Sequence, residues 1–525
     1  MLINMPHVIT AIPRLIAVPL VLLTCSLFFL PGRYDGPPSF DTIKFYGKNV
    51  TEAGSVFSAT VHDFWQDLAS ALLEAQPQCP PLKLDGEPIG SMADFRPVKK
   101  AHAKHPDRLV DFTSKDETAL LQAHYRIRTS AQRLAPRLPF NKDTTGIVTT
   151  ANARYMPIFL VSLRMLRRTG CRLPVEVFID DWTKYEPTVC DTVLPSLNAR
   201  CVVLSNIYNK AEGIQKPDHF QYKVLAILFS SFQHVLFLDS DAFPSHDPTP
   251  LFTTAPYTSH GLVTWPDYWA LTTSLHFYHI ASIPPELPQS RYSTESGQLL
   301  LNKHTHRASL LMMVYYNYYG PDYYYPLLSQ GSHGAGDKET FVPAALAVSQ
   351  PWYQVRTGAS ALGRVRNGAF KGIGLAQADP REDYTYLPPL RSHVHDDAQW
   401  QIADLAPLPS PPTITTTPAA DANTTIPPST PAPAVPRKPR PLFLHQNMLK
   451  LDPKTMLRDK SQTTFEADGT PHRMWGSEQD MVGMLGYDVE KVLWGVILTE
   501  ACREHVEGET CTAMTQHIAD VFEVV

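Results

Sequence analysis

The chain lacks dense runs of basic residues. Its 525 residues include 46 Lys and Arg against 51 Asp and Glu, for a formal net charge of -5. Binding to the phosphate backbone of nucleic acids depends on clustered positive charge, so this composition argues against a nucleic-acid partner. No internal repeat is visible, which disfavours solenoids and propellers. The length and a hydrophobic content of 43% leave room for a large core and two to three domain-sized units.

Several catalytic and metal-binding motifs are missing as well. No two cysteines are spaced as CxxC, which disfavours zinc ribbons and thioredoxin-like redox sites. The GxxxxGK[ST] motif of phosphate-binding loops, GxSxG, HExxH and the kinase motifs do not occur. Of the seven cysteines, Cys25 lies in an N-terminal apolar run and the other six form an even set. Cys502 and Cys511 are near enough for a local disulfide, whereas the other pairings cannot be deduced.

One long apolar run stands near the N-terminus. Residues 15–30, LIAVPLVLLTCSLFFL, carry no charge and follow Arg14. Together with residues 8–13, the run is about long enough to cross the roughly 30 Å hydrocarbon core of a bilayer. A cleaved signal peptide and a buried core helix are the alternatives, but no clear cleavage site follows, and the terminal position disfavours a core helix. We expect a cytoplasmic tail at 1–14, a single-pass signal anchor at 15–30, and a body in the lumen of the secretory pathway.

The composition and the predicted secondary structure of the rest of the chain change at several points. Residues 31–140 are predicted to form a stem and a helical lead-in, with an amphipathic helix at 56–75. From 141 to 405, β-rich runs alternate with helical ones, which is typical of a mainly parallel sheet flanked by helices in an α/β fold. Residues 406–440 are rich in Pro, Thr and Ala and are expected to be a disordered insertion. Residues 441–525 are expected to complete the domain that the insertion interrupts.

The stretch HVLFLDSDAF, residues 234–243, places two carboxylates directly after a predicted strand. Asp239 and Asp241 point to the same side of an extended chain, and they repel each other unless a cation lies between them. Ligands of α/β sheets collect beyond the carboxyl ends of strands. Mn²⁺ and Mg²⁺ accept carboxylate oxygens and leave positions open for phosphate oxygens. A solvated turn is the alternative, but the preceding strand favours a metal that clamps a nucleotide diphosphate.

Three further stretches carry candidate site residues. His445, in FLHQN, would complete an Asp/Asp/His set for Mn²⁺, with a structural histidine as the alternative. In TESGQLLLNK, Glu295 and Gln298 precede an apolar run, and Gly297 permits close backbone approach. Asp337, in the glycine-rich stretch QGSHGAGDKETF, is either a site residue or a residue that starts a helix.

These blocks together resemble the fungal α-mannosyltransferases of glycosyltransferase family 71, Golgi enzymes that build outer mannose chains. The resemblance runs in order from residue 145 to 453, through GIVTTANARY, LRRTGCRLPVEVF, QYKVLAILFSSFQHVLFLDSDAFPSHDPTPLF, GLVTWPDYW, TESGQLLLNK, QGSHGAGDKETF, KGIGLAQADP and FLHQNMLKLDP. It implies a GT-A fold, a GDP-mannose donor, Mn²⁺ and retention of the α configuration. It also implies a type II membrane protein of the Golgi with a lumenal catalytic domain.

The resemblance also implies roles for individual residues. Asp239 and Asp241 correspond to the family's DxD motif, and His445 to a late histidine that serves as the third metal ligand. Lys223, in the helix before the DxD motif, is a basic residue expected near the donor. The blocks expected to face the donor sugar and the acceptor supply Glu295, Gly297, Gln298 and Asp337.

The expected activity is therefore transfer of mannose from GDP-mannose to a mannose hydroxyl of a glycoprotein glycan. One alternative is a different donor, such as UDP-GlcNAc. A second is a glycoside hydrolase, which needs two carboxyls about 5 to 10 Å apart, with Asp239 and Asp337 as candidates. A third is a non-catalytic glycan-binding membrane protein. The sequence leaves the linkage, α1,2 or α1,3, the acceptor class and the oligomeric state open.

Overall fold

The computed structural model describes residues 50–87, 104–366, 369–386, 438–457 and 463–522. The expected anchor at 15–30 and nearly all of the expected insertion at 406–440 lie outside these residues. Among the residues that are described, no helix is both long and apolar enough to span a membrane. The chain divides after Gly54, and the unit from Ser55 onward contains the sheets and the candidate site.

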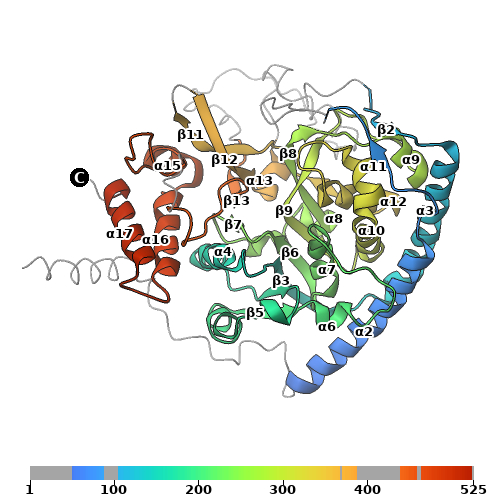
Figure 1. Cartoon of the computed structure of the whole chain (residues 1–525), viewed down its shortest axis with the longest axis horizontal. Helices are drawn as coiled ribbons and strands as arrows, with labels where there is room; N and C mark the ends of the chain where they lie inside the picture. Colours follow the sequence, from blue (N-terminus) through green and yellow to red (C-terminus); the bar gives the residue numbers. More distant parts are fainter. Residues whose placement is uncertain (1–49, 88–103, 367–368, 387–437, 458–462, 523–525) are drawn as a thin grey trace, which may run out of the picture. The chain divides into compact units, whose positions relative to one another are not determined.

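A seven-stranded sheet forms the centre of this unit (Figure 1). In spatial order its strands are β10 (Tyr353–Gln354), β8 (Leu262–Ala270), β9 (Tyr292–Asn302), β6 (Phe232–Leu238), β3 (Asn141–Thr150), β4 (Val175–Ile179) and β5 (Ala199–Val203). Neighbouring strands from β6 to β5 are parallel, as are β10 and β8, whereas β9 runs antiparallel to both β6 and β8. The α/β class and the mainly parallel sheet are confirmed, and one inserted antiparallel strand, β9, makes the sheet mixed.

A second, four-stranded sheet is antiparallel throughout. Its strands in spatial order are β11 (Ser360–Arg366), β12 (Ala369–Ala378), β13 (Pro441–His445) and β7 (Ala242–Pro244). Because only three residues separate the end of β6 from the start of β7, residues 239–241 connect the two sheets. A small two-stranded sheet joins β1 (Lys83–Leu84) and β2 (Leu109–Val110).

Helices cover both faces of the large sheet (Figure 1). The longer ones are α2 (Val50–Glu74), α3 (Ser114–Leu134), α4 (Met156–Arg168), α7 (Gln221–Phe229), α10 (Arg307–Tyr318), α15 (Glu478–Leu485), α16 (Val489–Ala501) and α17 (Glu509–Phe522). The shorter ones are α5 (Leu194–Ser196), α6 (Ser205–Tyr208), α8 (Tyr257–His260), α9 (Leu275–Ala281), α11 (Tyr325–Ser329), α12 (Phe341–Ala347) and α13 (Pro380–Thr385). The amphipathic helix expected at 56–75 is α2. The helix before the DxD motif, α7, ends at Phe229, because Ser230 already has extended backbone (ψ 143°).

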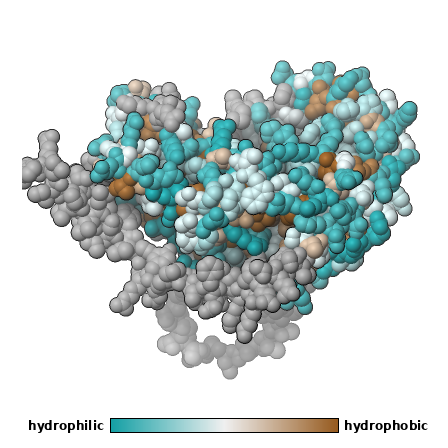
Figure 2. Space-filling view, turned by 60° about the horizontal axis from the view of Figure 1, so that its bottom comes forward, coloured by the Kyte–Doolittle hydropathy of each residue, from teal (hydrophilic) through white to brown (hydrophobic). Residues whose placement is uncertain are grey.

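The buried side chains of the described residues form hydrophobic clusters on each side of the large sheet and around α15 to α17. Cys502 and Cys511 form a disulfide that connects α16 to α17, as expected from their spacing. A second disulfide joins Cys190 to Cys201, a pairing that the sequence left open. The face shown in Figure 2 is mostly hydrophilic, with hydrophobic residues scattered between polar ones.

Candidate metal and donor site

The two aspartates of the DxD motif lie in the short connection between β6 and β7. The β6 strand is almost wholly buried, so its carboxyl end fixes where this connection begins. The backbone N–H of Asp239 donates to the Gly297 carbonyl of β9 at 2.8 Å, and the N–H of Gln446 donates to the Asp241 carbonyl at 2.9 Å. The connection is thus held by β9 on one side and by the end of β13 on the other.

The structure brings His445 to these aspartates from more than 200 residues along the chain. In the antiparallel pairing of β13 with β7, His445 lies opposite Ala242, the residue that follows Asp241. One ligand atom from each of Asp239, Asp241 and His445 lies within 4.8 Å of the others. Two carboxylates and an imidazole at such spacing suit a divalent cation such as Mn²⁺. The metal set predicted from the sequence stays a prediction, but its three members do lie together.

Asp241 is the more deeply buried of the two aspartates, with 6% of its side chain exposed. Its Oδ1 lies 3.1 Å from His445 Nε2, and its Oδ2 accepts a bond from Lys450 Nζ. Burial by itself would raise the pKa of Asp241, but His445 and Lys450 outweigh burial and lower it. Asp241 is therefore a permanent carboxylate, as a metal ligand requires.

Asp239 faces a different cation. Its Oδ2 lies 3.3 Å from Lys223 Nζ, and 28% of its side chain is exposed. Burial raises the pKa of Asp239, and the positive charges of Lys223 and His445 oppose that rise. Lys223 itself is buried, and its ammonium also lies 3.1 Å from Asp337 Oδ2 and donates to the Ser296 carbonyl at 2.6 Å. Lys223 thus joins the DxD motif to Asp337.

Glu295 supports His445 from the other side of the ring. Its Oε1 lies 3.0 Å from His445 Nδ1 and accepts the backbone N–H of Gly297 at 2.8 Å. Burial would lower the pKa of His445, but the charges of Glu295 and Asp241 and their hydrogen bonds raise it well above 6.5. A histidine that donates Nδ1–H to a carboxylate presents Nε2 to a metal, a common arrangement at metal sites. Glu295, expected to face the sugar, therefore contacts the histidine.

Gly297 permits a close approach, as the sequence suggested, but by a protein side chain. A Cβ at this position would lie 2.4 Å from His445 Nδ1. Gln298, next in β9, is fully buried, and neither its Oε1 nor its Nε2 has a hydrogen-bond partner among the described residues. Such an amide is costly unless a further polar group satisfies it. Gln298 keeps its predicted role as a candidate for sugar positioning.

Lys450 is the site residue that sequence reasoning missed. It follows His445 by five residues in FLHQNMLKLDP, in a turn region after β13. Its distance in sequence from Asp241 gave no local signal, and only the pairing of β13 with β7 brings the two together. A cation at this position competes with a metal for Asp241 and lies beside any anion that the metal holds.

The sequence of the chain is similar to a family of known proteins. The family model described as "Mannosyltransferase putative" matches residues 144–293 and 285–379. Alpha-1,2-mannosyltransferase MNN21 of Candida albicans is 34% identical over 437 residues, which cover 74% of this chain and 62% of that protein. Alpha-1,2-mannosyltransferase MNN2 of Saccharomyces cerevisiae is 33% identical over 343 residues, which cover 58% and 57%. Over these residues the chain is similar to mannosyltransferases.

These matches confirm the resemblance drawn from the ordered sequence blocks. The chain spans between 41 and 62% of the length of the first three curated relatives that it matches. Among solved structures, galactosyltransferase LgtC in complex with donor and acceptor sugar analogs is similar over 40% of this chain and 73% of its own. The two chains are 14% identical over this region, with a TM-score of 0.27.

Proposed function

We propose that the chain is a GT-A α-mannosyltransferase that transfers mannose from GDP-mannose to a mannose hydroxyl of a glycoprotein glycan. The observation that carries the proposal is the cluster of Asp239, Asp241 and His445 in a chain that is similar to mannosyltransferases. The relatives are named alpha-1,2-mannosyltransferases, so we propose an α1,2 linkage. The chain would be anchored in the Golgi membrane by residues 15–30, with the catalytic domain in the lumen.

The proposed site works mainly by holding and orienting groups. Asp239, Asp241 and His445 would hold Mn²⁺, which, when bound, supplies positive charge that stabilises the departing diphosphate. Lys450, with about a third of its side chain exposed, adds a movable positive charge beside Asp241. Lys223 is fixed between Asp239 and Asp337, so it aligns the DxD motif with the glycine-rich loop.

Retention of the α configuration fits a site that contains no assigned nucleophile. The acceptor hydroxyl would attack from the face that the diphosphate leaves, and a phosphate oxygen would take the hydroxyl proton. The protein then contributes positioning and electrostatic stabilisation rather than a dedicated base. Gln298 and Asp337 remain our candidates for positioning the sugars.

The test is a transfer assay of the full chain in detergent with radiolabelled GDP-mannose, UDP-GlcNAc and other nucleotide sugars. We expect transfer from GDP-mannose to α-mannosides, loss of transfer in EDTA and recovery with Mn²⁺, followed by linkage analysis. Asp241→Asn should abolish transfer. Asp247→Asn is the matched control, because Asp247 only fixes the turn at Thr249 and an amide oxygen keeps that role.

Other outcomes point to the alternatives. Transfer from UDP-GlcNAc alone would show that the donor is UDP-GlcNAc rather than GDP-mannose. Release of free sugar from a glycan, unaffected by EDTA, would indicate a hydrolase. Glycan binding without any transfer would indicate a binding protein. Protease protection of sealed membrane vesicles tests the lumenal orientation.

A further inference from the structure

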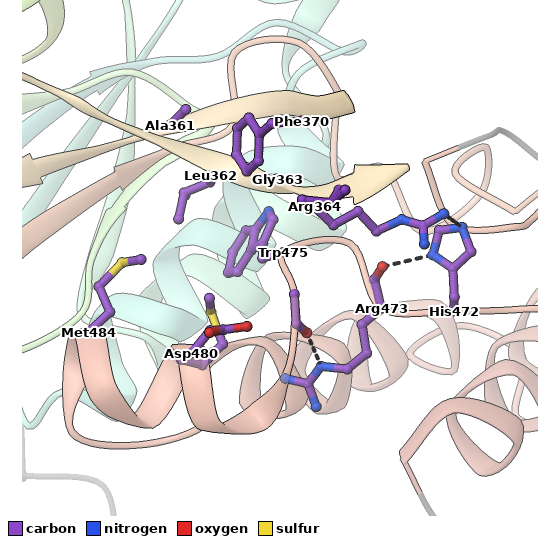
Figure 3. A pocket seen from close by; sticks show the side chains of 13 residues that line it. Ala361, Leu362, Gly363, Arg364, Phe370, His472, Arg473, Trp475, Asp480 and Met484 are labelled. Carbon is purple, nitrogen blue, oxygen red and sulfur yellow. Dashed lines mark hydrogen bonds between the residues drawn. The ribbon is translucent and has the colours of Figure 1, made fainter. Parts of the chain in front are cut away.

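A groove lies along the free edge of the four-stranded sheet, away from the cluster of Asp239, Asp241 and His445. Within the described part of the chain, β11 is the outermost strand and pairs only with β12. Residues 361–365 of β11 line one side of a cavity of about 700 Å³. The other side is lined by helix α15 and by His472, Arg473, Trp475 and Gly476 (Figure 3). The cavity is within the size range of small-ligand pockets.

The register of the sheet relates this groove to the metal cluster. His445 of β13 lies opposite Leu375 of β12, and Leu375 lies opposite Ala361 of β11. Since neighbouring strands are about 4.8 Å apart, Ala361 is roughly 10 Å from His445 across the sheet. The near end of the groove is therefore within the reach of a short oligosaccharide whose end lies at the cluster.

A hydrogen-bonded connection also links the floor of the groove to the DxD motif. The indole N–H of Trp475 donates to Gln446 Oε1 at 3.1 Å, and Gln446 Nε2 donates to the Ile373 carbonyl of β12 at 3.1 Å. The backbone N–H of Gln446 in turn donates to the Asp241 carbonyl. The groove is thus fixed relative to the metal ligands rather than placed on a separate element.

The arginine side chains that line the groove are paired within the protein. Arg364 Nη1 lies 2.6 Å from Glu466, and Arg473 Nη1 lies 2.9 Å from Asp488. The one carboxylate of the lining, Asp480, accepts hydrogen bonds from the N–H and the hydroxyl of Ser477 at the start of α15. The lining therefore offers no unpaired arginine to a phosphate or an acidic peptide, which favours a neutral ligand. A neutral ligand that fits must also hydrogen-bond, because the free edge of a strand presents backbone N–H and C=O groups.

An aromatic ring completes the surface. Phe370 of β12 is 52% exposed and stands on the hairpin above the groove, while Trp475, Asp480 and Met484 lie below it (Figure 3). A sugar ring offers C–H groups that pack against an aromatic face and hydroxyls that pair with backbone groups. The exposed ring of Phe370 and the backbone groups at the free edge of β11 match these two parts of a sugar.

We propose that the groove along β11 binds the distal mannose units of a neutral, α-linked oligomannose acceptor. The inference rests on the proposed function for the identity of the glycan. It adds a second contact region that selects acceptors longer than one or two sugars. The competing occupant is an extended peptide that adds a strand to β11.

The first experiment measures binding without transfer. The full chain, without donor, is titrated calorimetrically with an α-mannotetraose and with methyl α-mannoside, as wild type and as Phe370→Ala. We expect the variant to bind the tetrasaccharide about fivefold more weakly, a size typical of losing one aromatic contact. Tyr125→Ala is the matched control, because Tyr125 is 60% exposed on α3 and does not line the groove. Equal affinities of wild type and Phe370→Ala would overturn the proposal.

Hydrogen exchange separates a glycan from a peptide. Amides of residues 361–365 should be protected by the tetrasaccharide. Protection by a deglycosylated glycoprotein, but not by the sugar, would overturn the proposal in favour of strand addition.

In transfer assays, Phe370→Ala should raise KM for the tetrasaccharide about fivefold and leave KM for methyl α-mannoside unchanged. If the wild type binds the sugar with this Phe370 dependence but transfers nothing, the proposed function fails while the groove stands.

Discussion

Replacing Gly297 with Ala is expected to weaken the binding of Mn²⁺ by displacing the imidazole of His445. A Cβ at position 297 would lie 2.4 Å from His445 Nδ1 and 2.7 Å from its Cε1, whereas ordinary contacts begin near 3.4 Å. The ring must therefore move by about 1 Å, the difference between the contact distance and the space available. Such a shift stretches the 3.0 Å bond from His445 Nδ1 to Glu295 beyond hydrogen-bond range and turns Nε2 away from the aspartates.

The size of the effect follows from what Glu295 does for the histidine. Loss of the partner that orients a metal-binding histidine typically lowers metal affinity by about 10- to 100-fold, which is about 1.4 to 2.7 kcal/mol. Isothermal titration of the full chain with MnCl₂, checked by the electron paramagnetic resonance of free Mn²⁺, measures the loss. Glu295→Ala should lower the affinity to a similar extent, whereas Glu295→Gln should retain more of it, because one amide oxygen can accept both bonds.

A glycine elsewhere provides the control. Gly483 in α15 has no atom within 4 Å of a Cβ, so Gly483→Ala should leave Mn²⁺ binding unchanged and stabilise the helix by up to about 1 kcal/mol. An unchanged Kd for Gly297→Ala, with thermal unfolding like that of the wild type, would refute the inference that Glu295 and Gly297 set the orientation of His445. Absence of Mn²⁺ binding by the wild type would refute the metal site itself.

Three further predictions concern other parts of the chain. Lys450→Ala should strengthen Mn²⁺ binding several-fold in the same titration, because its ammonium no longer competes for Asp241; weaker binding would contradict this. Replacing Cys502 and Cys511 with Ser should lower the free energy of unfolding in urea by about 3 kcal/mol, from the entropy of the loop that the disulfide closes. Burial lowers the pKa of Lys303 to about 7, so the unfolded chain binds more protons between pH 7 and 10.5 and the folded state gains stability as pH rises. The free energy of unfolding of the wild type should therefore rise by about 2 kcal/mol between pH 7 and 9 relative to Lys303→Met, and parallel pH profiles would contradict this.

The parts of the site that follow from local sequence pattern could be predicted. A buried apolar strand that ends in Asp239 and Asp241 is visible in a window of ten residues, since the strand and its polar end are neighbours in sequence. The same holds for the helix–strand alternation and for the disulfide between Cys502 and Cys511. His445 could be proposed as a third ligand from its place at the end of an apolar run and from the resemblance to a family, but no local pattern shows that β13 pairs with β7.

The parts that depend on strand register could not be predicted. Glu295 contacts His445 because antiparallel β9 lies between β6 and β8, and an antiparallel strand among parallel ones leaves no local signal. Lys450 reaches Asp241 only through the pairing of β13 with β7. A slip of one residue in that pairing would turn His445 to the other face of the sheet, so the site depends on tertiary packing that fixes the register.

The pairing of β13 with β12 and β7 explains how His445 completes the site although it lies late in the chain, after residues 387–437. The segment 387–437 separates α13 from β13, yet the structure fixes the chain on both sides of it. The Asp379 N–H donates to the Arg440 carbonyl at 2.8 Å, and the Arg440 N–H donates to Glu382 Oε2 at 2.8 Å. The strands β12 and β7 on either side of β13 thus keep His445 in register with the aspartates.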